Sequence, residues 1–135
     1  MKRILIADGR PEDIAHLIKG LSERFEVVYV TSTNSAHECL GKIHPDAAVF
    51  DHSTIPQDRR TSPEDQAGYL ADLVVTSHVL NPHMPIVFRC VEEELYPHFR
   101  KRLKEREVPP GEVMLTNKHQ DEPEIRDYFL RKLGA

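Results

Sequence analysis

Short apolar runs alternate along the chain with longer segments in which apolar residues recur every three or four positions. The runs are rich in Ile, Val, Leu, Phe and Tyr, and each has the length of a strand buried in a sheet. Five such strands are predicted, over residues 3–8, 25–30, 47–50, 85–90 and 113–116.

The segments between these runs have helical periodicity. Ile14, Leu17, Ile18 and Leu21 follow the i, i+3, i+4, i+7 spacing of one apolar stripe, which predicts an amphipathic helix packed against a sheet. Pro11 is suited to the first helical position. Similar stripes predict four more helices, which begin near Ser35 with capping-box spacing to Glu38, at Ser62–Pro63 with an end at Leu80, near Leu95, and near Asp121 with Glu124.

Strands that alternate with helices five times predict right-handed crossovers and a parallel sheet covered on both faces. This is the flavodoxin-like, doubly wound α/β class, here with a (βα)5 order in a single domain over residues 1–135. The connection over residues 52–62 is unusually long, polar and rich in turn signals. We expect its part from 54 to 62 to cover a pocket or to serve as a docking loop.

Composition narrows the function. A net charge of -4 argues against a nucleic-acid surface, and no apolar run approaches the length of a membrane helix. The N-terminal segment reaches an acid too early for a signal peptide, and Cys39 and Cys90 form no disulfide framework. We therefore expect a cytoplasmic protein that binds a protein partner or a small ligand.

Candidate chemistry lies at the carboxyl ends of the predicted strands, where ligands bind in open parallel sheets. Asp8 follows the first strand, Asp51 the third, Cys90 ends the fourth, and Lys118 lies just past the fifth. We expect Asp8 and Lys118 to lie within reach of the Asp51 carboxylate.

These residues resemble the response-regulator receiver family of two-component signalling over nearly the whole chain. The segments that carry the resemblance are residues 4–11, residues 45–51 with Pro56, residues 85–90, and Lys118. The resemblance implies that Asp51 is the phospho-acceptor, that neighbouring acids hold Mg²⁺, and that Lys118 and a hydroxyl contact the phosphoryl group. It also implies a sensor histidine kinase or another signalling protein as partner, and a monomer or weak homodimer.

The sequence departs from the family pattern at four positions. Gly9 stands where a second acid binds the metal, and Cys90 stands at the hydroxyl position. Leu115 replaces an aromatic residue, and His119 replaces a proline. We therefore expect Mg²⁺ to bind only weakly, through Asp8 and Asp51, and Gly9→Asp to tighten it.

Simpler interpretations of the same residues stay open. Asp8 could cap the first helix, and Asp51 could be an ordinary turn residue. Lys118 could be solvated, and Cys90 could be a small buried hydrophobe. Arg10 could place its guanidinium near Asp51 and mimic part of the missing cation, or could be solvated.

The sequence thus predicts a receiver-like signalling domain, not an enzyme, with Asp51 as phospho-acceptor and partner docking as output. One alternative is a pseudo-receiver that acts as an interaction module without phosphorylation. Another is a small phosphohydrolase with Asp51 as its nucleophile, which is weakened because Ser53 stands where a second acid would be needed.

Overall fold

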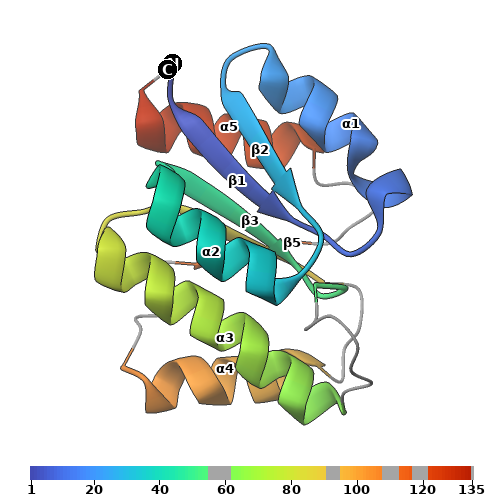
Figure 1. Cartoon of the computed structure of the whole chain (residues 1–135), viewed down its shortest axis with the longest axis vertical. Helices are drawn as coiled ribbons and strands as arrows, with labels where there is room; N and C mark the ends of the chain where they lie inside the picture. The colour runs from blue at the N-terminus through green and yellow to red at the C-terminus, as the bar shows by residue number, and fades with distance from the viewer. Residues whose placement is uncertain (55–61, 91–94, 108–112, 117–121, 135) are drawn as a thin grey trace.

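A five-stranded parallel sheet forms the centre of the molecule (Figure 1). The computed structural model describes residues 1–54, 62–90, 95–107, 113–116 and 122–134. Its strands are β1 (Arg3–Ala7), β2 (Glu26–Val30), β3 (Ala47–Asp51), β4 (Ile86–Arg89) and β5 (Val113–Thr116). They are ordered β2-β1-β3-β4-β5, and every neighbouring pair is parallel. The flavodoxin-like prediction is confirmed, with strand ends within one residue of those expected.

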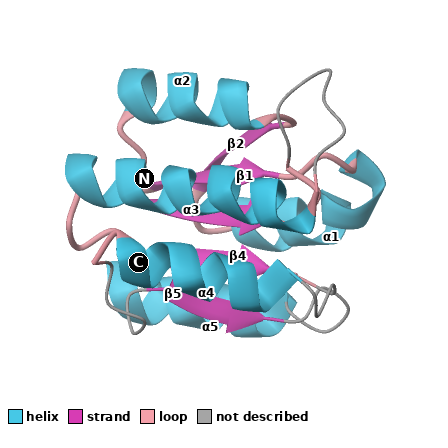
Figure 2. Ribbon diagram, turned by 90° about the horizontal axis from the view of Figure 1, so that it is seen from below, coloured by secondary structure: helices cyan, strands magenta, loops and turns pink. Residues whose placement is uncertain are grey.

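In the part of the chain that the structure describes, five helices cover the two faces of this sheet. They are α1 (Pro11–Ser22), α2 (Thr33–Ile43), α3 (Pro63–Leu80), α4 (Leu95–Glu105) and α5 (Glu122–Leu133). Figure 2 shows α2, α3 and α4 together on one face, and α1 and α5 lie on the other. Within the described residues, no helix is both long enough and apolar enough to cross a membrane.

Two hydrophobic clusters result, one on each face of the sheet. Alternate residues along a strand point to opposite faces, so β1 contributes Leu5 to the cluster under α2, α3 and α4, and Ile6 to the cluster under α1 and α5. Aromatic rings fix both layers. Phe88 stacks on Phe99 of α4 with ring centroids 4.0 Å apart, and Phe25 meets Phe129 of α5 edge-on at 6.5 Å.

The helix starts follow local capping chemistry, with one correction. Pro11 and Pro63 occupy the first turns of α1 and α3, as predicted. The second helix, however, is capped by Ser32 and not by Ser35, because the Ser32 hydroxyl accepts a hydrogen bond from the Ser35 backbone N–H at 3.1 Å. The predicted cap at Asp121 lies outside the described residues.

The corrected cap gives a direct test. Ser32→Ala should lower the free energy of unfolding by about 1 kcal/mol, because it leaves a first-turn N–H without its side-chain acceptor. Ser35→Ala is the matched control and should cost less, since the Ser35 backbone N–H still donates to the Ser32 hydroxyl and only the Ser35 hydroxyl, which accepts from Ser32 at 3.1 Å, is lost. Urea unfolding of both variants measures the difference, and equal losses would contradict the assignment of Ser32.

Candidate functional site

The strand alternation brings two acids and an arginine to one end and one face of the sheet. Ile6, Val49 and Val87 all belong to the cluster under α1 and α5, so the residues two positions later, Asp8, Asp51 and Arg89, are directed to that same face. Asp51 of β3 and Arg89 of β4 are also register partners. The carboxyl ends of β1, β3 and β4 therefore meet at a charged cluster.

Both carboxylates of this cluster are completely buried and both contact Ser53. The Ser53 hydroxyl lies 2.8 Å from Oδ1 of Asp8 and 2.7 Å from Oδ1 of Asp51. It has one hydrogen, so it donates to one carboxylate at a time, and it accepts a hydrogen bond from the Gly9 N–H at 3.0 Å. Ser53 thus joins the ends of β1 and β3 through a single side chain.

Arg89 supplies positive charge to the two acids. Its Nη1 lies 3.4 Å from Oδ2 of Asp8 and 3.6 Å from Oδ2 of Asp51, and its side chain is 2% exposed. Among the described residues it is the largest fully buried side chain. A charge buried this deeply is tolerated only where opposite charges and hydrogen bonds surround it.

The turn after β3 is held by its own hydrogen bonds. Asp51 Oδ1 accepts from the Ser53 N–H at 2.9 Å, and the His52 N–H donates to the Arg89 carbonyl at 2.9 Å. The buried Thr54 hydroxyl donates to the Ala7 carbonyl at 2.7 Å. Thr54 is therefore fixed in the core, which corrects the expected start of the covering loop at this residue. Residues 55–61 of that loop lie outside the described residues.

Gly9 packs directly against this turn. A Cβ at position 9 would lie 2.5 Å from the Ser53 carbonyl oxygen and 3.2 Å from its carbonyl carbon. The backbone at Gly9 does not have a positive φ, so space and not backbone conformation excludes a side chain. Gly9→Asp therefore cannot restore a metal ligand without moving the turn, which corrects the expectation from sequence.

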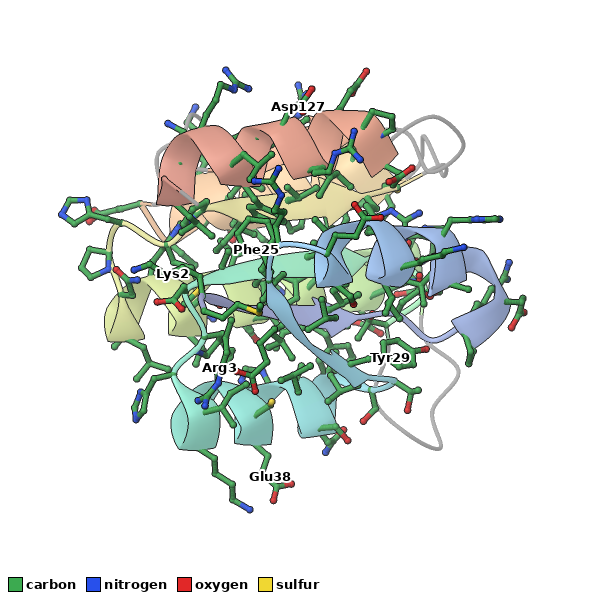
Figure 3. The ribbon with its side chains drawn as sticks, turned by 90° about the horizontal axis from the view of Figure 1, so that it is seen from above. Lys2, Arg3, Phe25, Tyr29, Glu38 and Asp127 are labelled. Carbon is green, nitrogen blue, oxygen red and sulfur yellow. The ribbon has the colours of Figure 1, made fainter. Side chains whose placement is uncertain are left out.

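The negative field of the site reaches the neighbouring strand. Tyr29 of β2 donates from its hydroxyl to the Asp8 carbonyl at 2.8 Å. Burial raises the pKa of Tyr29, and the carboxylates of Asp8, Glu12 and Asp51 raise it further, so the phenol stays protonated and remains a donor. Figure 3 shows Tyr29 near this end of the sheet and Arg3 toward the opposite end.

The structure brings together some of the predicted site residues. Asp8 and Asp51 meet at the carboxyl ends of their strands, as expected. Asp8 does not cap the first helix, because the N-cap of α1 is Arg10, whose N–H donates to Asp8 at 2.7 Å. Asp51 forms the local turn considered for it. The Arg10 side chain is exposed, in keeping with a solvated arginine. Lys118 and His119 lie outside the described residues, as does the Leu115 side chain.

Cys90 lies on the other face. Its side chain is 2% exposed and belongs to the cluster under α2, α3 and α4, together with Phe88. Tyr96 of α4 donates from its hydroxyl to the Cys90 carbonyl at 3.1 Å. This placement agrees with a small buried hydrophobe, and a phosphoryl contact by Cys90 stays a prediction.

Sequence reasoning missed Arg89 and Ser53. A signal for Arg89 was present, because a charge inside an otherwise apolar buried strand needs a partner. Asp51 ends the adjacent strand β3, and Asp8 follows β1, the next strand along. Ser53 carried no comparable signal. Serine is common in turns, and its bridging position depends on how closely the two turns approach.

The residues of the site fit a magnesium ion poorly. Asp8 and Asp51 are the described carboxylates at the strand ends, and a guanidinium already lies beside both. Among the described residues, no three His, Cys, Asp or Glu side chains are grouped so that they could hold a metal ion. A dication would be repelled by the guanidinium. It would also lack the second acid of the family pattern, because Gly9 stands at that position and the Ser53 carbonyl occupies the space of a side chain there.

The close approach at Gly9 is testable with a matched pair of glycines. Gly9→Ala should lower the free energy of unfolding by about 1–3 kcal/mol, because the new Cβ must displace the Ser53 backbone. Gly41→Ala, where nothing lies within 4 Å of the new Cβ in α2, should instead raise it by about 0.5–1 kcal/mol. Chemical denaturation measures both, and a neutral Gly9→Ala would show that the turn yields easily.

Comparison with known proteins gives a consistent picture of the fold. No family model matches the sequence, and no curated protein matches it. Among solved structures, a response regulator receiver protein from Sinorhizobium medicae superposes with a TM-score of 0.72 at 19% identity, covering 99% of this chain and 95% of that one.

Two further structures extend the comparison. A CheY-like response regulator receiver domain protein from Methanospirillum hungatei gives a TM-score of 0.70 at 17% identity, covering 99% and 94% of the two chains. A receiver modulated diguanylate cyclase from Pelobacter carbinolicus gives 0.67 at 15% identity, covering 99% and 93%. At these identities the similarity establishes the shared fold.

Proposed function

Because the chain has the fold of response-regulator receiver domains, we propose that it is a receiver-like signalling domain. Asp51 is its candidate phospho-acceptor, and docking to a partner protein is its output. The observation that carries this proposal is the buried Asp51 carboxylate at the carboxyl end of the central strand, beside Asp8. A sensor histidine kinase or another signalling protein is the proposed partner, and a cytoplasmic location belongs to the same proposal.

The chemistry of such a site is phosphoryl transfer to a carboxylate. An oxygen of Asp51 forms a bond to phosphorus while the bond between phosphorus and the donor atom breaks, a nitrogen in a phosphohistidine or an oxygen in acetyl phosphate, and the donor leaves with that electron pair. The incoming group is anionic, so its approach to Asp8 and Asp51 requires positive charge. Arg89 lies where it can offset part of that charge, and Lys118 is proposed to add a further cation.

One observation favours the phosphorylation-independent alternative. The Arg89 guanidinium already lies beside both carboxylates, and the missing acid at Gly9 coincides with a turn that fills its space. A site whose charges are compensated from within gains less from an incoming phosphoryl group. A pseudo-receiver that docks to its partner in one fixed state is therefore the second candidate.

The phosphohydrolase alternative gains no support from this geometry. Ser53 lies at the position where such an enzyme would need a second acid, and its hydroxyl bridges the two carboxylates. A serine hydroxyl in this setting is a hydrogen-bond donor and not a general acid near neutral pH. We therefore do not propose enzymatic turnover for this domain.

A phosphodonor experiment tests the proposed acceptor. Incubation with acetyl phosphate and Mg²⁺ should add one phosphoryl group to wild type slowly and incompletely, because the poor metal fit weakens charge compensation. Intact-protein mass spectrometry measures the product, and Asp51→Asn should abolish it. Loss of the group on treatment with hydroxylamine would mark an acyl phosphate and separate it from phosphoserine.

Ser53→Ala is the matched control, since the Ser53 hydroxyl lies 2.7 Å from the Asp51 carboxylate, and it should still be modified. Wild type that gains no more phosphate than Asp51→Asn would overturn Asp51 as the acceptor and support the pseudo-receiver. Continuous release of inorganic phosphate from a phosphate ester would contradict both the receiver-like and the pseudo-receiver proposals and would support the phosphohydrolase alternative.

A further inference from the structure

We infer that Arg89 is the resident cation of the acidic site and takes the place of a divalent metal ion. This inference rests on the proposed function, because it concerns how a receiver-like site balances its carboxylates. It also predicts a property that is independent of phosphorylation: the folded protein should not require, and should not respond to, magnesium.

The geometry carries this inference through a shared cation. Nη1 of Arg89 lies 3.4 Å from Oδ2 of Asp8 and 3.6 Å from Oδ2 of Asp51, so one nitrogen faces an oxygen of each acid. The Oδ1 atoms of the same two acids face Ser53. Each carboxylate thus has one oxygen directed to the guanidinium and one to the hydroxyl, which is how a bridging cation and a bridging donor are accommodated.

The backbone holds Arg89 in this position. Arg89 is the register partner of Asp51 in the sheet, and its backbone carbonyl accepts a hydrogen bond from the His52 N–H at 2.9 Å. The strand therefore fixes where the side chain starts, and the side chain, on the same face as the cluster under α1 and α5, is 2% exposed. A side-chain cation is present in every molecule, whereas the occupancy of a metal site depends on the concentration of the metal ion.

A guanidinium also excludes the metal that it replaces. It brings a positive charge within 4 Å of both candidate ligands, so a dication at the same carboxylates meets direct repulsion. Magnesium gives up its water reluctantly and is held through carboxylates in near-octahedral geometry. Removal of the Arg89 side chain should allow Mg²⁺ to bind, because the Asp8 and Asp51 carboxylates would then face each other across Ser53 without that guanidinium.

The test compares thermal unfolding in excess EDTA and in MgCl₂ for wild type and Arg89→Met. Wild type should show the same Tm in both. Arg89→Met should unfold about 10 °C lower in EDTA, since it takes the guanidinium away from two buried carboxylates. It should then regain about 4 °C when the Mg²⁺ concentration is roughly ten times its Kd. Isothermal titration with MgCl₂ should give heat for Arg89→Met and none for wild type.

Matched variants separate this effect from other causes. Arg100→Met removes an exposed arginine of α4 and should leave both the Tm and its indifference to Mg²⁺ unchanged. Lys118→Met tests the other cation predicted for the site and should create no Mg²⁺ response of its own. If Arg89→Met does not fold, Asp8→Asn/Arg89→Met removes one charge of each sign and should fold without a Mg²⁺ response.

Three results would overturn the inference. These are a wild-type Tm that rises with Mg²⁺, an Arg89→Met variant that folds yet ignores Mg²⁺, and a double variant that is less stable than Arg89→Met. None of these measurements uses a phosphodonor or a partner, so such a failure would leave the receiver-like proposal standing. Conversely, failure of Asp51 to accept phosphate would leave Arg89 as the cation of a pseudo-receiver.

Discussion

The burial of two carboxylates against one guanidinium is the interaction on which the rest of this site depends. Asp8 and Asp51 are fully buried, and a buried carboxylate is tolerated only with hydrogen-bond donors and nearby positive charge. Ser53 provides the donor and Arg89 the charge. The turns after β1 and β3 and the end of β4 converge because each delivers one part of this arrangement.

The same arrangement connects the site to the helices of one face. The His52 N–H bonds to the Arg89 carbonyl, and Gln66 of α3 donates to the His52 carbonyl. On the far side of β4, the Tyr96 hydroxyl of α4 bonds to the carbonyl of Cys90, the residue after Arg89. Hydrogen bonds therefore connect the turn after β3 to α3 and the end of β4 to α4.

The environments of Gly9, Ser53 and Arg89 are linked in three dimensions. The absent side chain at Gly9 lets the Ser53 carbonyl approach the end of β1, and this approach places the Ser53 hydroxyl between the two acids. Arg89 then occupies the side of both carboxylates that faces away from Ser53. The space at Gly9, the turn at Ser53 and the guanidinium of Arg89 therefore act together on the same two carboxylates.

The sequence by itself determined the five strands, the five helices and the parallel order, because short continuous apolar runs indicate strands buried on both faces and the 3.6-residue apolar period indicates helices buried on one face. It also placed Asp8 and Asp51 at one edge, since parallel strands end together. It did not determine that Ser32 and not Ser35 caps α2. The cap depends on where the chain turns into the helix, and there the Ser32 hydroxyl accepts from the Ser35 N–H. Only the tertiary structure decided that Arg89, and not Arg10, faces the acids, because register and strand parity select which buried side chain reaches them.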